Sequence, residues 1–333
     1  MASSLTHADE HASTRLRAVR WTLTDLPGPP RSATPGVVLD LGWTLTRPLL
    51  FQLDPERAHR LVLASLARFT GLSQAVLAME GCVHDSLATQ LGPLSLPSPI
   101  GLAAGLDKDA EAVETWPSMG FGFIEMGTVT ALPQPGNPVP RMFRLVPERG
   151  LLNRMGFNNQ GSEALAHRLG ALRESGDWPS IPVGANIGKS RATPLESAAE
   201  DYRTSVLRLH RIVDFLTVNI SSPNTPGLRE LQQADQLARL LDAVIPTASP
   251  CPVFLKLAPE LSGEDLGAAL DTAIEQGIAG IIATNTTSSR PGTTGRLDEA
   301  GGVSGAPLWP LARERIGQVL AHVDGRVPVV GVG

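Results

Sequence analysis

Residues 214–229 read DFLTVNISSPNTPGLR, and this stretch decides how the rest of the chain is interpreted. Its first half, 215–221, is a short apolar run rich in β-branched residues, which predicts a buried strand. Two prolines and a glycine within 222–227 then predict a loop. Loops that follow strands commonly carry the functional side chains of α/β proteins. By itself the segment fits ordinary turn chemistry equally well, so the surrounding sequence has to decide between a turn and a site.

Length and composition are those of a globular protein that is long enough for one large α/β barrel or two ordinary domains. It has 333 residues, of which 42% are hydrophobic and 18% charged, and its net charge is -5. This balance gives no electrostatic case for binding nucleic acid. Cys82 and Cys251 lie far apart without the spacing of metal ligands, which predicts a reducing compartment and no metal site. The sequence contains no apolar run long enough for a spanning helix, but surface attachment to a membrane stays open.

From residue 93 onward, strand-like and helical patterns alternate. The seven predicted strands are 99–104, 121–126, 181–186, 215–221, 253–257, 280–284 and 327–331. Helical patterns fill most of the intervals, as in 162–174, 195–209, 230–243 and 263–276. This alternation predicts an α/β fold of the (β/α)8 TIM-barrel type with its eighth unit missing. An open doubly wound sheet is the alternative, but no Gly-x-Gly-x-x-Gly turn follows the first strand.

Two regions precede the barrel. Residues 1–36 are rich in Ser, Thr, Pro and Arg without a period, which predicts a disordered tail. Residues 37–92 are predicted to form a small helical module, in which Asp54-Pro55-Glu56 begins a helix with a capping Asp, a Pro at the first position and an acid in the first turn. From the pattern alone, packing of these helices on the barrel is favoured over an interfacial position in a membrane.

The polar residues that interrupt the apolar pattern lie at the ends of the predicted strands. Only three of the 28 basic residues are lysines, and Lys108, Lys189 and Lys256 all lie there. Four of the eight asparagines do too: Asn186, Asn219, Asn224 and Asn285. In a barrel these positions meet at one rim, so we predict a binding site.

The chemistry of these residues suits a flavin and a pyrimidine. Amide side chains both donate and accept, as the edges of a pyrimidine or an isoalloxazine require. Lysine suits a carboxylate or a negative charge on a flavin. For Asp107 and Glu125, catalysis and a purely structural hydrogen bond both stay open.

The chain resembles the membrane-associated, quinone-using dihydroorotate dehydrogenases from about residue 43 to its end. The segments that carry the resemblance are LLFQLDPERAH (49–59), GLAAGLDK (101–108), GTVT (127–130), NRMGFNN (153–159), NIGK (186–189), NISSPNTPG (219–227), ATNTT (283–287) and GGVSG (301–305). The residue at position 222 distinguishes the classes of this family. The quinone-using class has a serine there, whereas the soluble relatives have a cysteine.

The resemblance implies oxidation of dihydroorotate to orotate in pyrimidine biosynthesis by an FMN-dependent enzyme. FMN is expected across the barrel mouth, in contact with Ala104, Gly105, Leu106, Asp107, Lys108, Thr128, Asn186, Asn219, Lys256, Thr284 and Gly305. Dihydroorotate is expected against Lys108, Asn153, Arg154, Met155, Gly156, Phe157, Asn219, Asn224, Asn285 and Thr286. Ser222 is expected to remove the C5 proton, under a lid formed by 224–231.

For the amino-terminal module, the resemblance reverses the preference for simple packing. In this class the two helices lie on the membrane and form a tunnel for ubiquinone or menaquinone, and His59 and Arg144 match positions near the quinone. The expected location is the cytoplasmic side of a bacterial inner membrane, with a mitochondrial membrane as the less favoured alternative.

The carboxyl terminus departs from the family pattern. The family continues beyond Gly331-Val-Gly333 with a helix, an eighth strand and a second phosphate-binding turn that carries a Tyr-Thr or Tyr-Ser pair; Tyr202, on a predicted helix, cannot replace that pair. For the chain as printed we therefore expect weak FMN binding, poor solubility and no activity. Two rival interpretations remain at this point. One is another flavin barrel, such as a dihydropyrimidine or dihydrouridine reductase, and the other is a degenerate barrel without catalytic function.

Overall fold

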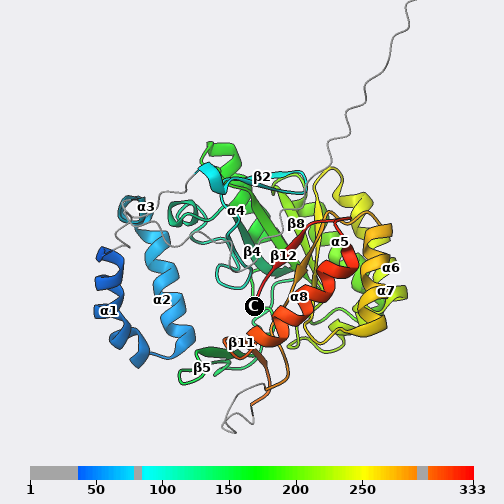
Figure 1. The fold of residues 1–333 in the computed structure, drawn as a ribbon. Coiled ribbons are helices and arrows are strands. Elements are labelled where there is room, and N and C mark those ends of the chain that lie inside the picture. The colour runs from blue at the N-terminus through cyan, green and yellow to red at the C-terminus, as the bar shows by residue number, and fades with distance from the viewer. Residues whose placement is uncertain (1–36, 79–84, 291–298) are drawn as a thin grey trace, which may run out of the picture.

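The computed structural model describes residues 37–78, 85–290 and 299–333 (Figure 1). The predicted disordered tail and Cys82 lie outside these ranges. Seven parallel strands form the main sheet in the spatial order β3-β4-β7-β8-β9-β10-β12. They are β3 (Gly101–Leu102), β4 (Phe123–Thr130), β7 (Val183–Gly188), β8 (Phe215–Asn219), β9 (Val253–Leu257), β10 (Gly280–Ala283) and β12 (Val329–Gly331). All seven predicted strands are thereby confirmed, and β3 and β12 are the two edges of the sheet.

Helices follow the strands and cover the outside of the sheet (Figure 1). They are α4 (Ser162–Ser175), α5 (Ala198–Leu209), α6 (Ala234–Ala248), α7 (Gly263–Glu275) and α8 (Trp309–Val323), and each packs beside the next. Short 3-10 turns complete the connections: η1 (Asp85–Leu87), η2 (Trp116–Met119), η3 (Leu195–Ser197) and η4 (Leu228–Gln232). Every residue of β4, β7, β8, β9 and β10 is buried, which explains why these strands read as continuous apolar runs rather than alternating ones. The chain has the TIM-barrel fold that its sequence predicts.

The amino-terminal end of the barrel is closed by aromatic rings that lie over glycines. Phe123 and Phe254 each pack edge-to-face against the ring of Phe215, with centroids 6.2 and 5.5 Å away. Each ring lies over the glycine opposite it on the neighbouring strand: Phe123 over Gly101, Phe215 over Gly184 and Phe254 over Gly280. The hairpin of β1 (Thr89–Leu91) and β2 (Leu94–Leu96) adds two buried leucines to this layer. The side chains at the bottom of the barrel therefore form an apolar layer.

Three helices precede the barrel and form a group at its side (Figure 1). They are α1 (Val37–Gln52), α2 (Pro55–Arg68) and α3 (Thr70–Ala78). The side chain of Asp54 accepts a hydrogen bond from the backbone N–H of Arg57 at 3.0 Å, so the predicted helix start at Asp54-Pro55 is confirmed.

A small antiparallel sheet lies at the end of the barrel opposite the β1–β2 hairpin (Figure 1). It consists of β5 (Met142–Leu145), β6 (Gly150–Asn153) and β11 (Gly302–Gly305), in the order β11-β6-β5. The sequence pattern does not indicate this sheet. Its strands are short, and β11 pairs with β6 across about half the chain, so no local pattern identifies it.

The rings over glycines give a direct test of the packing at the bottom of the barrel. A Cβ added to Gly184 would lie 2.2 Å from two ring carbons of Phe215. Gly184→Ala is therefore expected to lower the free energy of unfolding by about 1–3 kcal/mol. Gly317→Ala is the control, because a Cβ there meets nothing within 4 Å in α8, and it should be neutral or raise the stability by about 0.5–1 kcal/mol. Denaturant titrations that gave the same midpoint for both variants would contradict the packing.

Candidate functional site at the carboxyl rim of the barrel

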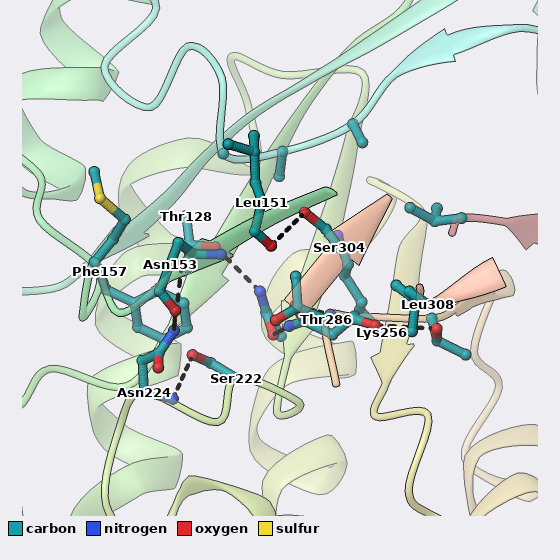
Figure 2. Close-up of a pocket in the computed structure, with 18 of the residues that line it drawn as sticks. Thr128, Leu151, Asn153, Phe157, Ser222, Asn224, Lys256, Thr286, Ser304 and Leu308 are labelled. Atoms are coloured by element: carbon teal, nitrogen blue, oxygen red, sulfur yellow. Dashed lines mark hydrogen bonds between the residues drawn. The ribbon is translucent and has the colours of Figure 1, made fainter. Parts of the chain in front are cut away.

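A cavity of about 400 Å³ opens at the carboxyl ends of the parallel strands, bordered by the small antiparallel sheet (Figure 2). Most of the residues predicted for the site line it. They are Ala104, Gly105, Lys108, Thr128, Asn153, Met155, Gly156, Phe157, Asn219, Ser222, Asn224, Lys256, Thr284, Asn285, Thr286 and Gly305. Parts of the chain nearly 200 residues apart thus meet at one rim, as the barrel topology requires.

The floor of the cavity is a cluster of buried amides centred on Asn219. The Asn219 amide nitrogen donates to Thr128 Oγ1 at 3.1 Å and to Asn186 Oδ1 at 3.0 Å. Its oxygen accepts hydrogen bonds from Ser221, through the backbone N–H and the hydroxyl. Asn285 donates to Ser221 Oγ at 2.9 Å. Because each amide is satisfied by its neighbours, the orientation of every one is fixed.

The structure answers the question that the sequence left open for the two acids. Glu125 accepts hydrogen bonds from the backbone N–H of Ala104 at 3.0 Å and from Asn186 at 2.9 Å. Asp107 accepts hydrogen bonds from two backbone N–H groups of the following turn and from the indole of Trp116, and is 1% exposed. Both carboxylates are therefore committed to inner hydrogen bonds that hold the first βα loop and the amide cluster.

The three lysines have different surroundings. Lys189 donates to backbone carbonyls of its own loop and does not line the cavity. The Lys256 ammonium is buried and lies 3.9 Å from Glu125 Oε2, too far for a hydrogen bond, so it keeps donors for a group in the cavity. The pKa of the Lys108 ammonium is lowered to about 8, chiefly by burial and then by the nearby cation of Arg141, while Glu56 and Asp109 act in the opposite direction.

Ser222 stands at the edge of the amide cluster with its hydroxyl on the cavity (Figure 2). It is 5% exposed, and its Oγ accepts the backbone N–H of Asn224 at 3.2 Å. The Asn224 amide in turn contacts Asn153 O at 3.2 Å, which ties the loop to the opposite wall. Thr286 also lines the cavity, but its Oγ1 is buried beside Gly302 without a hydrogen-bond partner among the described residues.

Four residues predicted for the site do not line the cavity. Asn186 lies beneath it in the amide cluster, and Asp107 points into the protein. Leu106 is largely exposed, and its carbonyl contacts His59 Nε2 at 2.6 Å. The Arg154 side chain turns away toward Glu299 and the ring of Phe143.

Sequence reasoning missed two supports of the site. The buried phenol of Tyr202 donates to the carbonyl of Asn219 at 2.8 Å, and burial raises its pKa, so it stays a donor. Arg229, in the loop after Ser222, pairs with Glu260 at 3.0 Å and donates to Ser221 O at 3.1 Å. A lone tyrosine on an amphipathic helix and an arginine in a loop carry no local signal of these contacts.

A second cavity, of about 470 Å³, lies between α1 and the β5–β6 hairpin. Trp43 and Phe51 of α1 line it together with Arg144 of β5, which donates to the carbonyls of Leu53 at 2.8 Å and Leu50 at 3.1 Å. Leu151 of β6 lines both cavities. His59 lies outside both, with Nδ1 buried and unpartnered among the described residues, and burial lowers its pKa.

Comparison with known proteins gives a consistent result. The family model of dihydroorotate dehydrogenase matches residues 86–333. The chain is 48% identical to the dihydroorotate dehydrogenase (quinone) of Gloeobacter violaceus, over 87% of this chain and 82% of that protein. It is 46% identical to the protein of the same name from Mycobacterium marinum, over 87% and 80%.

Solved structures agree with this assignment. The DHODH of Eimeria tenella in complex with ferulenol superposes with a TM-score of 0.75 at 33% identity, covering 84% of this chain and 81% of that chain. The ligand-free structure from the same organism gives the same TM-score and identity. From its sequence and its fold, this chain belongs to the dihydroorotate dehydrogenase family.

Proposed function

We propose that this protein oxidises dihydroorotate to orotate, with FMN as the bound flavin and a quinone as the electron acceptor. The observation that carries the proposal is the Ser222 hydroxyl at the edge of a cavity that also holds Lys108 and four asparagines. Among the named relatives, two are quinone-dependent dihydroorotate dehydrogenases. A dihydropyrimidine reductase or a degenerate barrel is less well supported, because neither accounts for those names.

The residues around the cavity match the substrate in polarity. The Lys108 ammonium supplies a positive charge for the carboxylate of dihydroorotate. The amides of Asn153, Asn224 and Asn285 offer donors and acceptors to the C=O and N–H groups of the dihydropyrimidine ring. Binding at these groups would hold the ring against Ser222.

Ser222 would act as the base that removes the proton from C5 while hydride leaves from C6. A hydroxyl is a weak base in water, so its burial and the exclusion of solvent by the loop are required for this role. Arg229 supports that loop by bridging it to Glu260. The proton and the hydride together balance the conversion of dihydroorotate to orotate.

The residues present fit a flavin. Lys256 keeps ammonium donors on the cavity, as a negative charge on a reduced ring requires. Gly105 has φ +115 and leaves open space where a Cβ would stand, so a planar ring can approach the backbone. FMN, when bound, would supply hydride acceptance and pass electrons on to the quinone. Ala104, Gly105, Thr128, Thr284 and Gly305 would hold it with Lys256.

The second cavity is the proposed quinone site. Its apolar walls from α1 suit a ring with an isoprenoid tail, and Arg144 offers a donor at one side. Leu151 separates this cavity from the first, which gives a short route for electrons. His59, with a free ring nitrogen on α2, is a second candidate at the quinone end. Ubiquinone and menaquinone fit these features equally.

The helical group is also the proposed membrane contact. Leu45 and Leu49 of α1 and Leu72 of α3 are each about two-thirds exposed, and Trp43 of α1 is half exposed. Within the residues that the structure describes, no helix is long and apolar enough to cross a bilayer. We infer a peripheral position on the cytoplasmic side of a bacterial inner membrane, with these helices in the interface.

Replacing the proposed base tests the reaction. Ser222→Ala in the holoenzyme should lower the rate of orotate formation about 10²–10⁴-fold, because the C5 proton has no acceptor. Orotate binding should persist. Ser175→Ala, at the exposed end of α4, is the control and should leave the rate unchanged. A Ser222→Ala enzyme with the parental rate would refute the assignment of the base.

Lys108 predicts a pH dependence of ligand binding. Its pKa is lowered to about 8, and only the protonated form attracts a carboxylate, so affinity for orotate should be full below this value and lost above it. The Kd of orotate should rise about tenfold for each pH unit above it. In Lys108→Met the Kd should be higher throughout and insensitive to pH. A parental Kd that stays constant across the same range would contradict the role of Lys108.

Vesicle sedimentation tests the membrane contact. Leu45→Glu combined with Leu49→Glu should lower the fraction bound to phospholipid vesicles at least about tenfold, because burying each leucine contributes about 1.5–3 kcal/mol. Leu207→Glu is the matched control, since that leucine is about half exposed on α5. Equal sedimentation of the double variant and the parent would rule out this surface.

A further inference from the structure

Glu56 of α2 and Arg141, which directly precedes β5, form an ion pair that is almost completely buried. Arg141 donates from Nη2 to Glu56 Oε1 at 2.8 Å and from Nε to Oε2 at 3.0 Å. The two residues are 6% and 9% exposed. Burial of two charges is costly, and an apolar pair of similar size often serves a fold equally well. The pair therefore calls for an explanation other than stability.

The remaining donors of Arg141 hold the loop between β4 and β5. Its Nη1 donates to the carbonyls of Pro135 at 2.6 Å and Asn137 at 2.9 Å. A Cβ on Gly136 would lie 2.7 Å from this same Nη1 and 2.3 Å from the carbonyl oxygen of Met155. The loop at Gly136 is thus packed tightly between the Arg141 guanidinium and the backbone of Met155.

The loop in turn holds the wall of the first cavity. The backbone N–H of Asn137 donates to Met155 O at 3.0 Å, and its side chain donates to Arg154 O at 2.8 Å. Arg141 itself accepts the backbone N–H of Arg154 at 2.8 Å. These bonds fix the backbone of Arg154 and Met155, and the segment 153–157 around them supplies four residues that line the cavity: Asn153, Met155, Gly156 and Phe157. A chain of contacts therefore runs from a carboxylate of the helical group to the substrate wall.

Electrostatics add a second link to the same site. Arg141 lowers the pKa of Lys108, while Glu56 and Asp109 raise it. For His59 of α2, Lys108 lowers the pKa and Glu56 raises it. Glu56 thus offsets the effect of the Arg141 cation on the lysine that we assign to the substrate carboxylate.

Building on the proposed function, we propose that Glu56 is a positioning residue for the dihydroorotate side of the reaction, acting through Arg141 on the wall 153–157. Glu56 lies in α2, which belongs to the helical group assigned to the quinone, but its proposed effect is on the binding of dihydroorotate. The plainer alternative is that the pair only docks α2 on the barrel. Arg144 offers the comparison, because its hydrogen bonds go to the carbonyls of Leu50 in α1 and Leu53 just after it, and not to the 135–137 loop.

A crossed pair of variants distinguishes these alternatives. In the holoenzyme, Glu56→Gln should raise the Kd of orotate and the KM of dihydroorotate about 10- to 100-fold, because the wall loses its fixed position. The KM of the quinone should stay within about twofold. Arg144→Gln should give the reverse pattern. Orotate binding is measured by calorimetry, so it does not depend on turnover.

Each outcome is decisive. If the parent protein does not bind orotate, the proposed function fails; if the parent binds it and Glu56→Gln binds it equally, only this inference fails. A raised quinone KM with unchanged orotate affinity in Glu56→Gln would show a docking role alone. Removing one member of a buried pair can prevent folding, so Glu56→Leu combined with Arg141→Met is the second variant. This apolar pair should fold and still bind orotate about 10- to 100-fold more weakly, because the donors to Pro135 and Asn137 are lost; parental affinity would overturn the proposal.

Discussion

The carboxamide of Asn219 joins the strand ends on which the site depends. It lies at the last residue of β8 and bonds to Thr128 of β4, Asn186 of β7 and Ser221 of its own loop. Buried amides are stable only when their donors and acceptors are paired, so each member fixes the others. Tyr202 below and Asn285 beside it complete the arrangement. The cluster holds Ser221, the residue before Ser222, while the Ser222 hydroxyl is held by the backbone N–H of Asn224 in its own loop.

The two ends of the barrel use opposite chemistry for a related reason. At the bottom, three phenylalanines pack over paired glycines in an apolar cluster. At the top, amides, lysines and hydroxyls replace them, and their mutual hydrogen bonds leave a cavity rather than a packed layer. The apolar end provides rigidity, and the polar end can then hold groups such as Lys256 with donors to spare.

Much of this arrangement follows from the sequence. The strands are buried on both faces, so their apolar runs are continuous and all seven were identified. The rare lysines and the asparagines mark the strand ends, because polar residues interrupt such runs only for a reason. The same logic could not separate Asn186, which lies under the cavity, from Asn219, which lines it. Nor could it show that Asp107 and Glu125 have structural hydrogen bonds, since this depends on partners brought together only by the fold.

Two of the features that escaped prediction are long-range. The pairing of β11 with β6 and the Glu56–Arg141 ion pair join residues far apart in the chain, and neither leaves a periodic pattern.

The most direct test of the proposed reaction is anaerobic reduction of the flavin in the holoenzyme, monitored by its yellow absorbance. Dihydroorotate should bleach the flavin without any nicotinamide, and a quinone should restore the colour. Bleaching by NADPH, with no response to dihydroorotate, would contradict it.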